Sequence, residues 1–375
     1  MLVAALLTGL GTAWAQTITL EDVSLGSLPD EFVPAQTGEE QQGRWGGVAY
    51  DTAVGGKVLA QPSTYAITSE PALRLERKIP LGDVRGRIDH LAIDLAHHHL
   101  FVAELGNNSV GVLDIVHDKL LHRIVGLKEP QGVGYDPATD AVYVANAGDG
   151  SVHRYRGSDF SPVGTLKLGD DADNIRVDHR TRQVVVGYGD GALALLDGES
   201  ANKAGEIRLT AHPESFQLEQ AGSRIFVNVP DARQVAVVDR ASGRQLATWT
   251  LSDAEANFPM ALDEAGERLL VVYRKPPLLA AFDTRTGAVV ARVPTCGDAD
   301  DVFFDVKRQR IYISCGEGTL AVIERQNDTY RELARIPTVP GARTALFVPD
   351  LDRLFLAVRA RDGEPAGVWV YRPTP

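Results

Sequence analysis

The sequence is poor in sulfur and in positive charge, and it has no apolar segment long enough to cross a bilayer. Its 375 residues include two cysteines and two methionines, and 38 Lys and Arg residues stand against 50 Asp and Glu residues, a net charge of −12. An acidic surface repels phosphate backbones, so nucleic acid is not an expected partner. The apolar run at residues 2–10 is shorter than a bilayer requires, so no membrane span is expected.

Residues 1–15 have the pattern of a secretory signal peptide. The apolar run is followed by Ala13, Trp14 and Ala15, which fit the small-x-small rule for cleavage after residue 15. A short membrane anchor is the alternative. We therefore expect a signal peptide at 1–15 and a periplasmic or secreted mature protein, and we expect that protein to be a monomer.

A repeat of about 42 residues occupies most of the chain. Seven short apolar segments each end at a residue that is usually Asp, and these end residues lie 41 to 44 positions apart. Two further apolar segments, rich in β-branched and aromatic residues, follow each of them. This period is the one expected of a four-stranded propeller blade. The aligned end residues are Asp94, Asp136, Asp178, Glu219, Asp263, Asp305 and Pro349.

The seventh repeat has three apolar segments and lacks a fourth. The segment PALRLERKIPL, residues 71–81, precedes the first repeat and can supply the missing strand. Closing the ring in this way removes edges that would otherwise promote aggregation. We predict an all-β, seven-bladed β-propeller over 71–375, closed by an N-terminal strand that completes the last blade. The regular period argues against a pair of sandwiches and against an open solenoid.

Residues 16–70 differ from the repeats, because they are rich in Gly, Gln, Glu and Pro. They contain GRWGGVAYD (43–51) and GKVLAQPS (56–63), which resemble the opening of a concanavalin-like sandwich domain. The region is too short to be that whole domain. We predict that it is a linker or a partial sandwich-like remnant.

Candidate site residues lie where the inner strand of each repeat begins, because these starts surround the mouth of a propeller's central channel. One and three positions before the aligned end residue, all seven repeats carry apolar side chains. The position five before has the same strand parity, yet six of its seven residues are polar and four are carboxylates. Solvated strand ends are the alternative to a site. The seven residues are Asp89, Gln131, Asp173, Glu214, Phe258, Asp300 and Thr344.

We predict a ligand-binding site from the polar members of this set and their neighbours. Several carboxylates that converge on one opening must share protons, pair with a cation or bind a metal. Carboxylate and amide oxygens suit Ca²⁺ or Mg²⁺, and the candidate metal ligands are Asp173, Asn174, Glu214 and Asp300. The candidates for a catalytic role are His90, His212 and Arg343. The predicted ligand-binding residues are Asp89, His90, Gln131, Asp173, Asn174, Glu214, Asn257, Asp300, Asp301 and Arg343.

The two cysteines lie in the sixth repeat. Cys296 precedes its inner strand and Cys315 ends its second strand. Counting across the expected hairpin places Cys315 opposite Asp300, so both cysteines fall at the channel-mouth end. We predict a disulfide that staples this loop, and two free thiols near the site are the alternative.

The repeats resemble those of the bacterial YVTN-type, YncE-like β-propellers over roughly residues 71–372. The strings that carry the resemblance are EPQGV, DADNIR, HPESFQLE, NFPMALD, GDADDVFFD and GARTALFVP. The resemblance implies a seven-bladed, largely extracytoplasmic protein without assigned chemistry. Some members are linked to DNA binding, which this acidic composition does not favour. A more distant similarity is to the gluconolactonase and regucalcin propellers, which hold a divalent metal at the channel mouth and hydrolyse lactones, although no motif aligns residue by residue.

The leading hypothesis is an exported, non-catalytic binding propeller that holds a small molecule, a glycan or a protein partner at the channel mouth. The alternative is a divalent-metal-dependent, lactonase-like hydrolase or a lyase that uses the same acidic ring. A structural propeller in a cell-envelope assembly is a third hypothesis, and the variation among the blade-specific polar strings argues against it.

Overall fold

The structure is a computed structural model that describes residues 2–5, 15–18, 46–49, 57–60, 71–361 and 363–375. The chain divides into two compact units, residues 1–69 and 70–375. In the first unit, β1 (Leu2–Ala5) pairs with β2 (Ala15–Ile18), and β3 (Gly46–Ala49) pairs with β4 (Lys57–Ala60), both antiparallel. The rest of the predicted signal peptide and of the predicted remnant at 16–70 lies outside the described residues, so both stay predictions.

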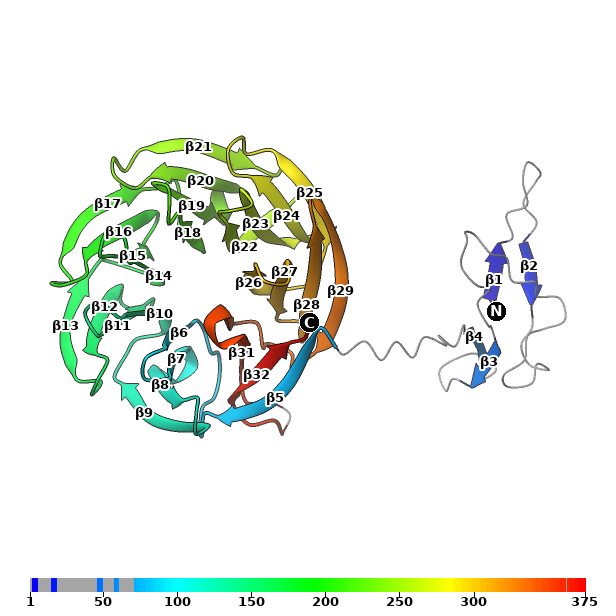
Figure 1. Ribbon diagram of the computed structural model, residues 1–375, viewed down its shortest axis with the longest axis horizontal. Helices are drawn as coiled ribbons and strands as arrows, with labels where there is room; N and C mark the ends of the chain where they lie inside the picture. The colour runs from blue at the N-terminus through cyan, green and yellow to red at the C-terminus, as the bar shows by residue number, and fades with distance from the viewer. Residues whose placement is uncertain (1, 6–14, 19–45, 50–56, 61–70, 362) are drawn as a thin grey trace. The chain divides into compact units, whose positions relative to one another are not determined.

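The second unit consists of seven four-stranded antiparallel sheets arranged in a ring, as Figure 1 shows. The prediction of a seven-bladed β-propeller is therefore confirmed. In six blades the four strands follow one another along the chain, from the innermost strand to the outermost. Blade 1 contains β6 (Leu91–Asp94), β7 (His99–Glu104), β8 (Ser109–Asp114) and β9 (Lys119–Val125). Blade 2 contains β10 (Pro130–Asp136), β11 (Ala141–Asn146), β12 (Ser151–Arg156) and β13 (Pro162–Lys167). Blade 3 contains β14 (Ala172–Asp178), β15 (Gln183–Tyr188), β16 (Ala192–Asp197) and β17 (Lys203–Arg208).

The remaining blades repeat this order. Blade 4 contains β18 (Phe216–Leu218), β19 (Arg224–Val229), β20 (Gln234–Asp239) and β21 (Gln245–Thr250). Blade 5 contains β22 (Glu255–Asp263), β23 (Arg268–Lys275), β24 (Pro277–Asp283) and β25 (Val289–Pro294). Blade 6 contains β26 (Ala299–Asp305), β27 (Arg310–Cys315), β28 (Thr319–Gln326) and β29 (Thr329–Pro337). Blade 7 contains β30 (Ala345–Val348), β31 (Arg353–Val358), β32 (Gly367–Pro373) and β5 (Leu73–Pro80). The helices of the described residues are three short 3₁₀ turns, η1 (Leu105–Asn107), η2 (Pro230–Ala232) and η3 (Pro349–Leu351).

Strand β5 closes the ring as the sequence predicts. It pairs antiparallel with β32, with Leu73 opposite Pro373 and Ile79 opposite Val368. Leu73 and Ile79 are fully buried in this position, as is Leu81 beyond the strand. Because these side chains fill the core on either side of blade 7, the closing strand contributes packing as well as backbone hydrogen bonds.

The core consists of the interfaces between adjacent blades. In blade 1, Phe101 of the second strand is fully buried and packs with Val112 of its own blade and with Val133 and Val144 of blade 2. The same arrangement recurs around the ring, because the second and third strands of each blade are covered on both faces. This double burial explains why these strands read in the sequence as continuous apolar runs.

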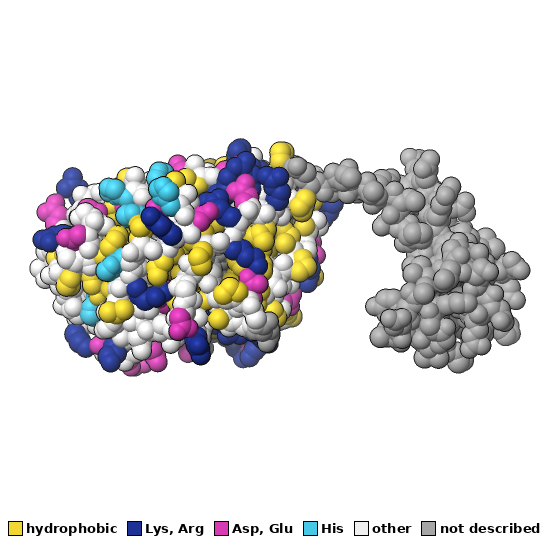
Figure 2. All heavy atoms as spheres, turned by 90° about the horizontal axis from the view of Figure 1, so that it is seen from below, with side chains coloured by type: hydrophobic (Ala, Val, Ile, Leu, Met, Phe, Trp, Pro, Cys, Tyr) yellow, Lys and Arg dark blue, Asp and Glu magenta, His cyan; other side chains and the backbone are white. Residues whose placement is uncertain are grey.

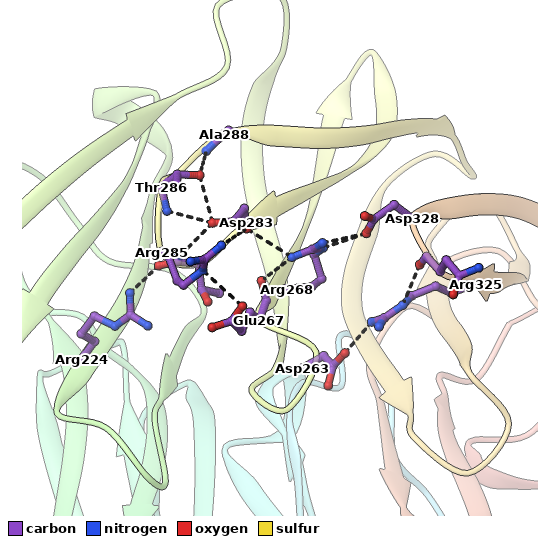
Figure 3. A network of polar contacts seen from close by, with 12 residues as sticks. Arg224, Asp263, Glu267, Arg268, Asp283, Arg285, Thr286, Ala288, Arg325 and Asp328 are labelled. Atoms are coloured by element: carbon purple, nitrogen blue, oxygen red, sulfur yellow. Dashed lines mark hydrogen bonds and ion pairs between the residues drawn. The ribbon is translucent and has the colours of Figure 1, made fainter.

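Charged residues join the blades at the end of the propeller opposite the channel mouth. Asp263, the last residue of β22, forms an ion pair with Arg325 of blade 6. Arg268 of blade 5 reaches Asp328 of blade 6 at 2.8 Å, and its guanidinium also lies 3.4 Å from Asp283. Figure 3 shows these contacts between blades 5 and 6, together with Arg224 of blade 4. The Asp that ends most repeats is thus part of the blade scaffold.

Charges of both signs are interspersed over the side of the propeller seen in Figure 2, with histidines gathered on one part of it. Six of the nine histidines lie between residues 90 and 122, in blade 1. Among the described residues, no helix has the length and hydropathy that crossing a membrane requires.

Candidate ligand site at the channel mouth

A β-bulge places the candidate side chains at the start of each inner strand. In blade 3 the pairing of β14 with β15 shifts register between Ala172 and Ile175, so Asp173 and Asn174 together face one residue of the partner strand. In blade 4 the amide of Glu214 donates to the Asn228 carbonyl. The carbonyl of the following residue, Ser215, accepts from the Asn228 amide. Glu214 and Ser215 thus both face Asn228, as two residues face one in blade 3. An extra residue bends the strand and redirects its side chains, which explains why the polar position breaks the apolar alternation.

The seventh repeat is aligned one residue differently from the sequence prediction. Val348, and not Pro349, pairs with Arg353 across the first hairpin, because η3 begins at Pro349. The residue that corresponds to Asp300 of blade 6 is therefore Arg343, and Thr344 is a buried neighbour whose hydroxyl contacts the Ile88 carbonyl. With this correction, every blade supplies one residue at the bulge position.

These seven bulge residues line a single cavity of about 270 Å³ at the channel mouth. The cavity is strongly polar, because it combines carboxylates, arginines and two histidines with a single aromatic ring. It brings together seven of the ten predicted ligand-binding residues: Asp89, His90, Gln131, Asp173, Glu214, Asp300 and Arg343. His212, a predicted catalytic candidate, also lines it. The other lining residues are Arg87, Asp171, Phe258 and Arg274.

One half of the cavity contains carboxylates that arginines neutralise. Arg87 lies 2.7 Å from Oδ2 of Asp89, which is almost completely buried. Asp300 pairs with two arginines, through Oδ2 with Nε of Arg343 at 2.8 Å and through Oδ1 with Arg274. Burial nevertheless raises the pKa of Asp89 well above its ordinary range, and Arg87 only partly opposes this.

The other half, formed by blades 3 and 4, has no arginine or lysine partner for its acids. Asp173 is only 6% exposed, and its Oδ1 has no hydrogen-bond partner among the described residues. Glu214 forms no side-chain hydrogen bond or ion pair within the described part of the chain. His212 lies beside them, with its Nε2 4.0 Å from Oδ2 of Asp173. Its Nδ1 contacts the Gly189 carbonyl at 2.7 Å and lies 3.6 Å from Oδ2 of Asp171.

This lack of counterions shifts the protonation of the group. Burial raises the pKa of Glu214 to about 8, and the negative charge of Asp173 adds to the rise while His212 opposes it. For His212, burial lowers the pKa, but the contacts with Asp173, Gly189 and Asp171 outweigh it and raise the pKa to about 9. At neutral pH the group therefore contains a protonated Glu214 beside a charged His212.

Three predicted site residues lie behind the cavity wall instead of in its lining. Asn257 is buried and donates through Nδ2 to Oδ1 of Asn228 at 2.9 Å, so it joins blades 4 and 5. Asn174 accepts at 3.3 Å from Arg176. Asp301 accepts from the Ala345 amide at 2.8 Å. None of the three is among the residues that line the cavity, and their predicted contact with a ligand stays a prediction. Asp301, which follows Asp300 in the blade 6 bulge, faces blade 7 instead. Burial raises the pKa of Asp301 to about 7, with His90 opposing the rise.

The predicted metal ligands do not form one coordination set. Asp300 forms ion pairs with two arginines, and the side-chain carbonyl of Asn174 accepts a hydrogen bond from Arg176. Of the four candidates, only Asp173 and Glu214 then remain as metal ligands. Across the described residues, no three His, Cys, Asp or Glu side chains are grouped as a metal ion requires. The residues present therefore do not fit Ca²⁺ or Mg²⁺, which take six or more oxygen ligands.

Sequence reasoning missed four lining residues, and two of them share a pattern. Arg87 and Asp171 lie two positions before the bulge residues of blades 1 and 3, as His212 does in blade 4. Extending the comparison of the repeats by two more positions towards the N-terminus, where the strand parity is the same, would have identified them. Arg274 comes from the second strand of blade 5, and its guanidinium lies 3.9 Å from the centre of the Phe258 ring. Only the three-dimensional arrangement shows that contact.

The disulfide prediction is confirmed. Cys296 and Cys315 are bonded, with their Cα atoms 5.9 Å apart, and both are buried. The residue opposite Cys315 is Ala299 and not Asp300 as counted from the sequence, because the blade 6 bulge adds one residue. The bond fixes the loop that carries Asp298, which Arg343 contacts at 2.8 Å.

Comparison with solved structures supports the fold. A chain in the structure of hydrazine synthase from Kuenenia stuttgartiensis is similar with a TM-score of 0.66 and 18% sequence identity, covering 73% of this chain and 93% of that chain. A chain of a mitotic checkpoint complex has a TM-score of 0.67 and 14% identity, covering 86% of this chain and 97% of that one. No family model and no curated protein matches the sequence. Identities this low establish the propeller fold alone.

Proposed function

We propose that this chain is an exported β-propeller that binds a small polar molecule at its channel mouth, with no catalytic step assigned. The observation that carries the proposal is the convergence of one bulge residue from each of seven blades on one cavity of about 270 Å³. That volume is close to the lower end of small-molecule sites, so a small molecule fits better than a glycan chain or a protein surface. The lining is polar enough to orient such a ligand by hydrogen bonds.

Export to the periplasm or outside the cell is part of this proposal. The apolar run and the Ala-Trp-Ala cleavage pattern support it, and so does the Cys296–Cys315 disulfide, since such bonds persist in oxidising compartments. The sequence resemblance to the YVTN-type, YncE-like propellers points in the same direction. The alternative of a metal-dependent, lactonase-like hydrolase gains no support, because the candidate metal ligands do not form one set.

A steric block of the cavity tests the proposal. Gln131 lines the cavity without forming an ion pair, so Gln131→Trp should fill the opening and leave its charge unchanged. Gln245 lies exposed on the outer strand of blade 4, which makes Gln245→Trp the matched control. Thermal melting against a set of small polar compounds should reveal ligands whose stabilisation disappears in Gln131→Trp and persists in Gln245→Trp. A ligand that stabilises both variants equally would place binding elsewhere and contradict the proposal.

A further inference from the structure

The two sides of the cavity differ in how their acidic side chains are paired, and this difference indicates the chemistry of the ligand. On the side of blades 5, 6, 7 and 1, each buried carboxylate already has an arginine partner. On the side of blades 3 and 4, three carboxylates face one imidazole: Asp171, Asp173 and Glu214 against His212. The second side is therefore the part of the cavity in which acidic side chains outnumber basic ones.

Asp173 is the centre of this deficit. Its side chain is more than nine-tenths buried and lines the cavity, yet Oδ1 receives no hydrogen bond from any described residue. Buried carboxylates are ordinarily satisfied by donors, because an ionised group without them is strongly unfavourable. Glu214, on the next blade, likewise makes no side-chain contact of this kind within the described residues. The two acids thus offer several free acceptor positions directed into one cavity.

We propose that this half of the channel mouth binds the protonated amino group of a small molecule, with Asp173 and Glu214 as its acceptors. The inference rests on the proposed function, since it names the ligand class of the same cavity. A primary ammonium group has three N–H donors and one positive charge, which the oxygens of two adjacent carboxyl groups can satisfy, and its charge favours release of the Glu214 proton to solvent. A carboxylate or phosphate group is repelled here, because the nearby arginines are paired with Asp89 and Asp300.

The number of acceptors separates an amine from a metal ion. Ca²⁺ takes six to eight oxygen ligands and Mg²⁺ takes six, whereas an ammonium group needs only as many acceptors as it has hydrogens. No metal-ligand group of three exists among the described residues, and the blade 3 and 4 side of the cavity offers Oδ1 of Asp173 and the carboxyl group of Glu214 as acceptors. The two acids therefore supply enough acceptors for an ammonium group and too few oxygen ligands for Ca²⁺ or Mg²⁺.

Three two-carbon probes test this assignment, because they differ only in the group at one end. Ethanolamine carries an ammonium group, ethylene glycol a hydroxyl and glycolate a carboxylate. At about 100 mM and matched ionic strength, ethanolamine should raise the melting temperature of the unmodified protein by about 2 °C, and the other two should not. Asp173→Asn and Glu214→Gln should each abolish the ethanolamine shift. Asp190→Asn is the control, because Asp190 is exposed on the same blade and does not line the cavity.

The possible results separate the amine assignment from its alternatives. A shift with ethylene glycol or glycolate and none with ethanolamine would overturn the amine assignment and leave the channel-mouth site in place. A shift with calcium chloride that exceeds the shift with ethanolamine would assign the acids to a metal and overturn it as well. An ethanolamine shift that survives in Asp173→Asn and in Glu214→Gln would place the amine outside this cavity. No shift with any probe would count against both the amine and the small-ligand proposal.

Discussion

At the scale of single residues, Asp173 and Glu214 determine the electrostatics of the channel mouth. Both are carried by bulges of adjacent blades, and neither has an arginine or lysine partner in the described part of the chain. The protein therefore holds Glu214 protonated near neutral pH, since its pKa is about 8. This arrangement costs stability when the proton is removed, which makes it measurable without a ligand.

The first prediction concerns the pH dependence of stability. The pKa of Glu214 is about 8 in the folded protein and near its ordinary value of 4.5 when unfolded. Between these pH values the folded state holds a proton that the unfolded state has released, so its contribution to stability falls as pH rises. Glu214→Gln cannot lose that proton. We expect the variant to melt about 2–4 °C above the unmodified protein at pH 8 and no higher at pH 5, measured by calorimetry.

The comparison of the two pH values is the internal control for that experiment. An equal gain at pH 5 and pH 8 would show that better packing, and not the removal of a buried charge, stabilises the variant.

The polar residues at the starts of the inner strands could be predicted from the sequence, but their individual roles could not. Asp89, Asp173 and Asp300 were recognisable because they interrupt an apolar alternation. Asn174 and Asp301 are also polar, yet Asn174 accepts from Arg176 of its own strand and Asp301 accepts from the Ala345 amide of the next blade. A bulge adds a residue to only one strand, and nothing in the spacing within that strand shows where the partner strand resumes its register.

At the scale of elements, the bulge and the disulfide together shape the rim of blade 6. The bulge turns Asp300 towards Arg274 and Arg343, and the Cys296–Cys315 bond holds the preceding loop against the end of the second strand. The sequence showed that the two cysteines belong to one hairpin. It could not show that Cys315 faces Ala299, because that register depends on the bulge.

The second prediction concerns this disulfide. Its cysteines are 19 residues apart, and on the loop-closure model a crosslink of that length contributes about 3 kcal/mol. The double variant Cys296→Ala and Cys315→Ala should lose about that amount of unfolding free energy in urea titration. Since the chain has two cysteines in all, a reducing agent should lower the stability of the unmodified protein and leave the double variant unchanged. Equal sensitivity of both proteins to the reducing agent would contradict the assignment.

At the scale of the whole molecule, the period of the apolar segments determines the architecture. Seven near-equal repeats can bury their strands on both faces only by packing side by side around an axis. The sequence therefore predicted the number of blades and the closing strand correctly. It misaligned the seventh repeat by one residue, because a 3₁₀ turn with Pro349 takes the place of the usual Asp.

The third prediction concerns ring closure. A chain that begins at residue 82 lacks β5 and with it the buried side chains of Leu73, Ile79 and Leu81. We expect such a chain to lose more than the 2–5 kcal/mol that one large core side chain contributes, and to form oligomers through the exposed edge of β32. Size-exclusion chromatography and urea titration measure both effects. A chain that begins at residue 70 keeps β5 and is the control, and equal behaviour of the two would show that blade 7 is stable with three strands.

The closing strand also places two distant residues side by side. Thr374 donates through its hydroxyl to the Pro71 carbonyl at 3.0 Å and through its amide to the Ala72 carbonyl at 3.1 Å. Because the polypeptide returns to its own starting blade, a short linker could join these residues and new termini could be opened at another interblade turn. Such a circular permutant would retain every strand pairing of the ring. The same seam is where a second module could be fused without approaching the ligand cavity.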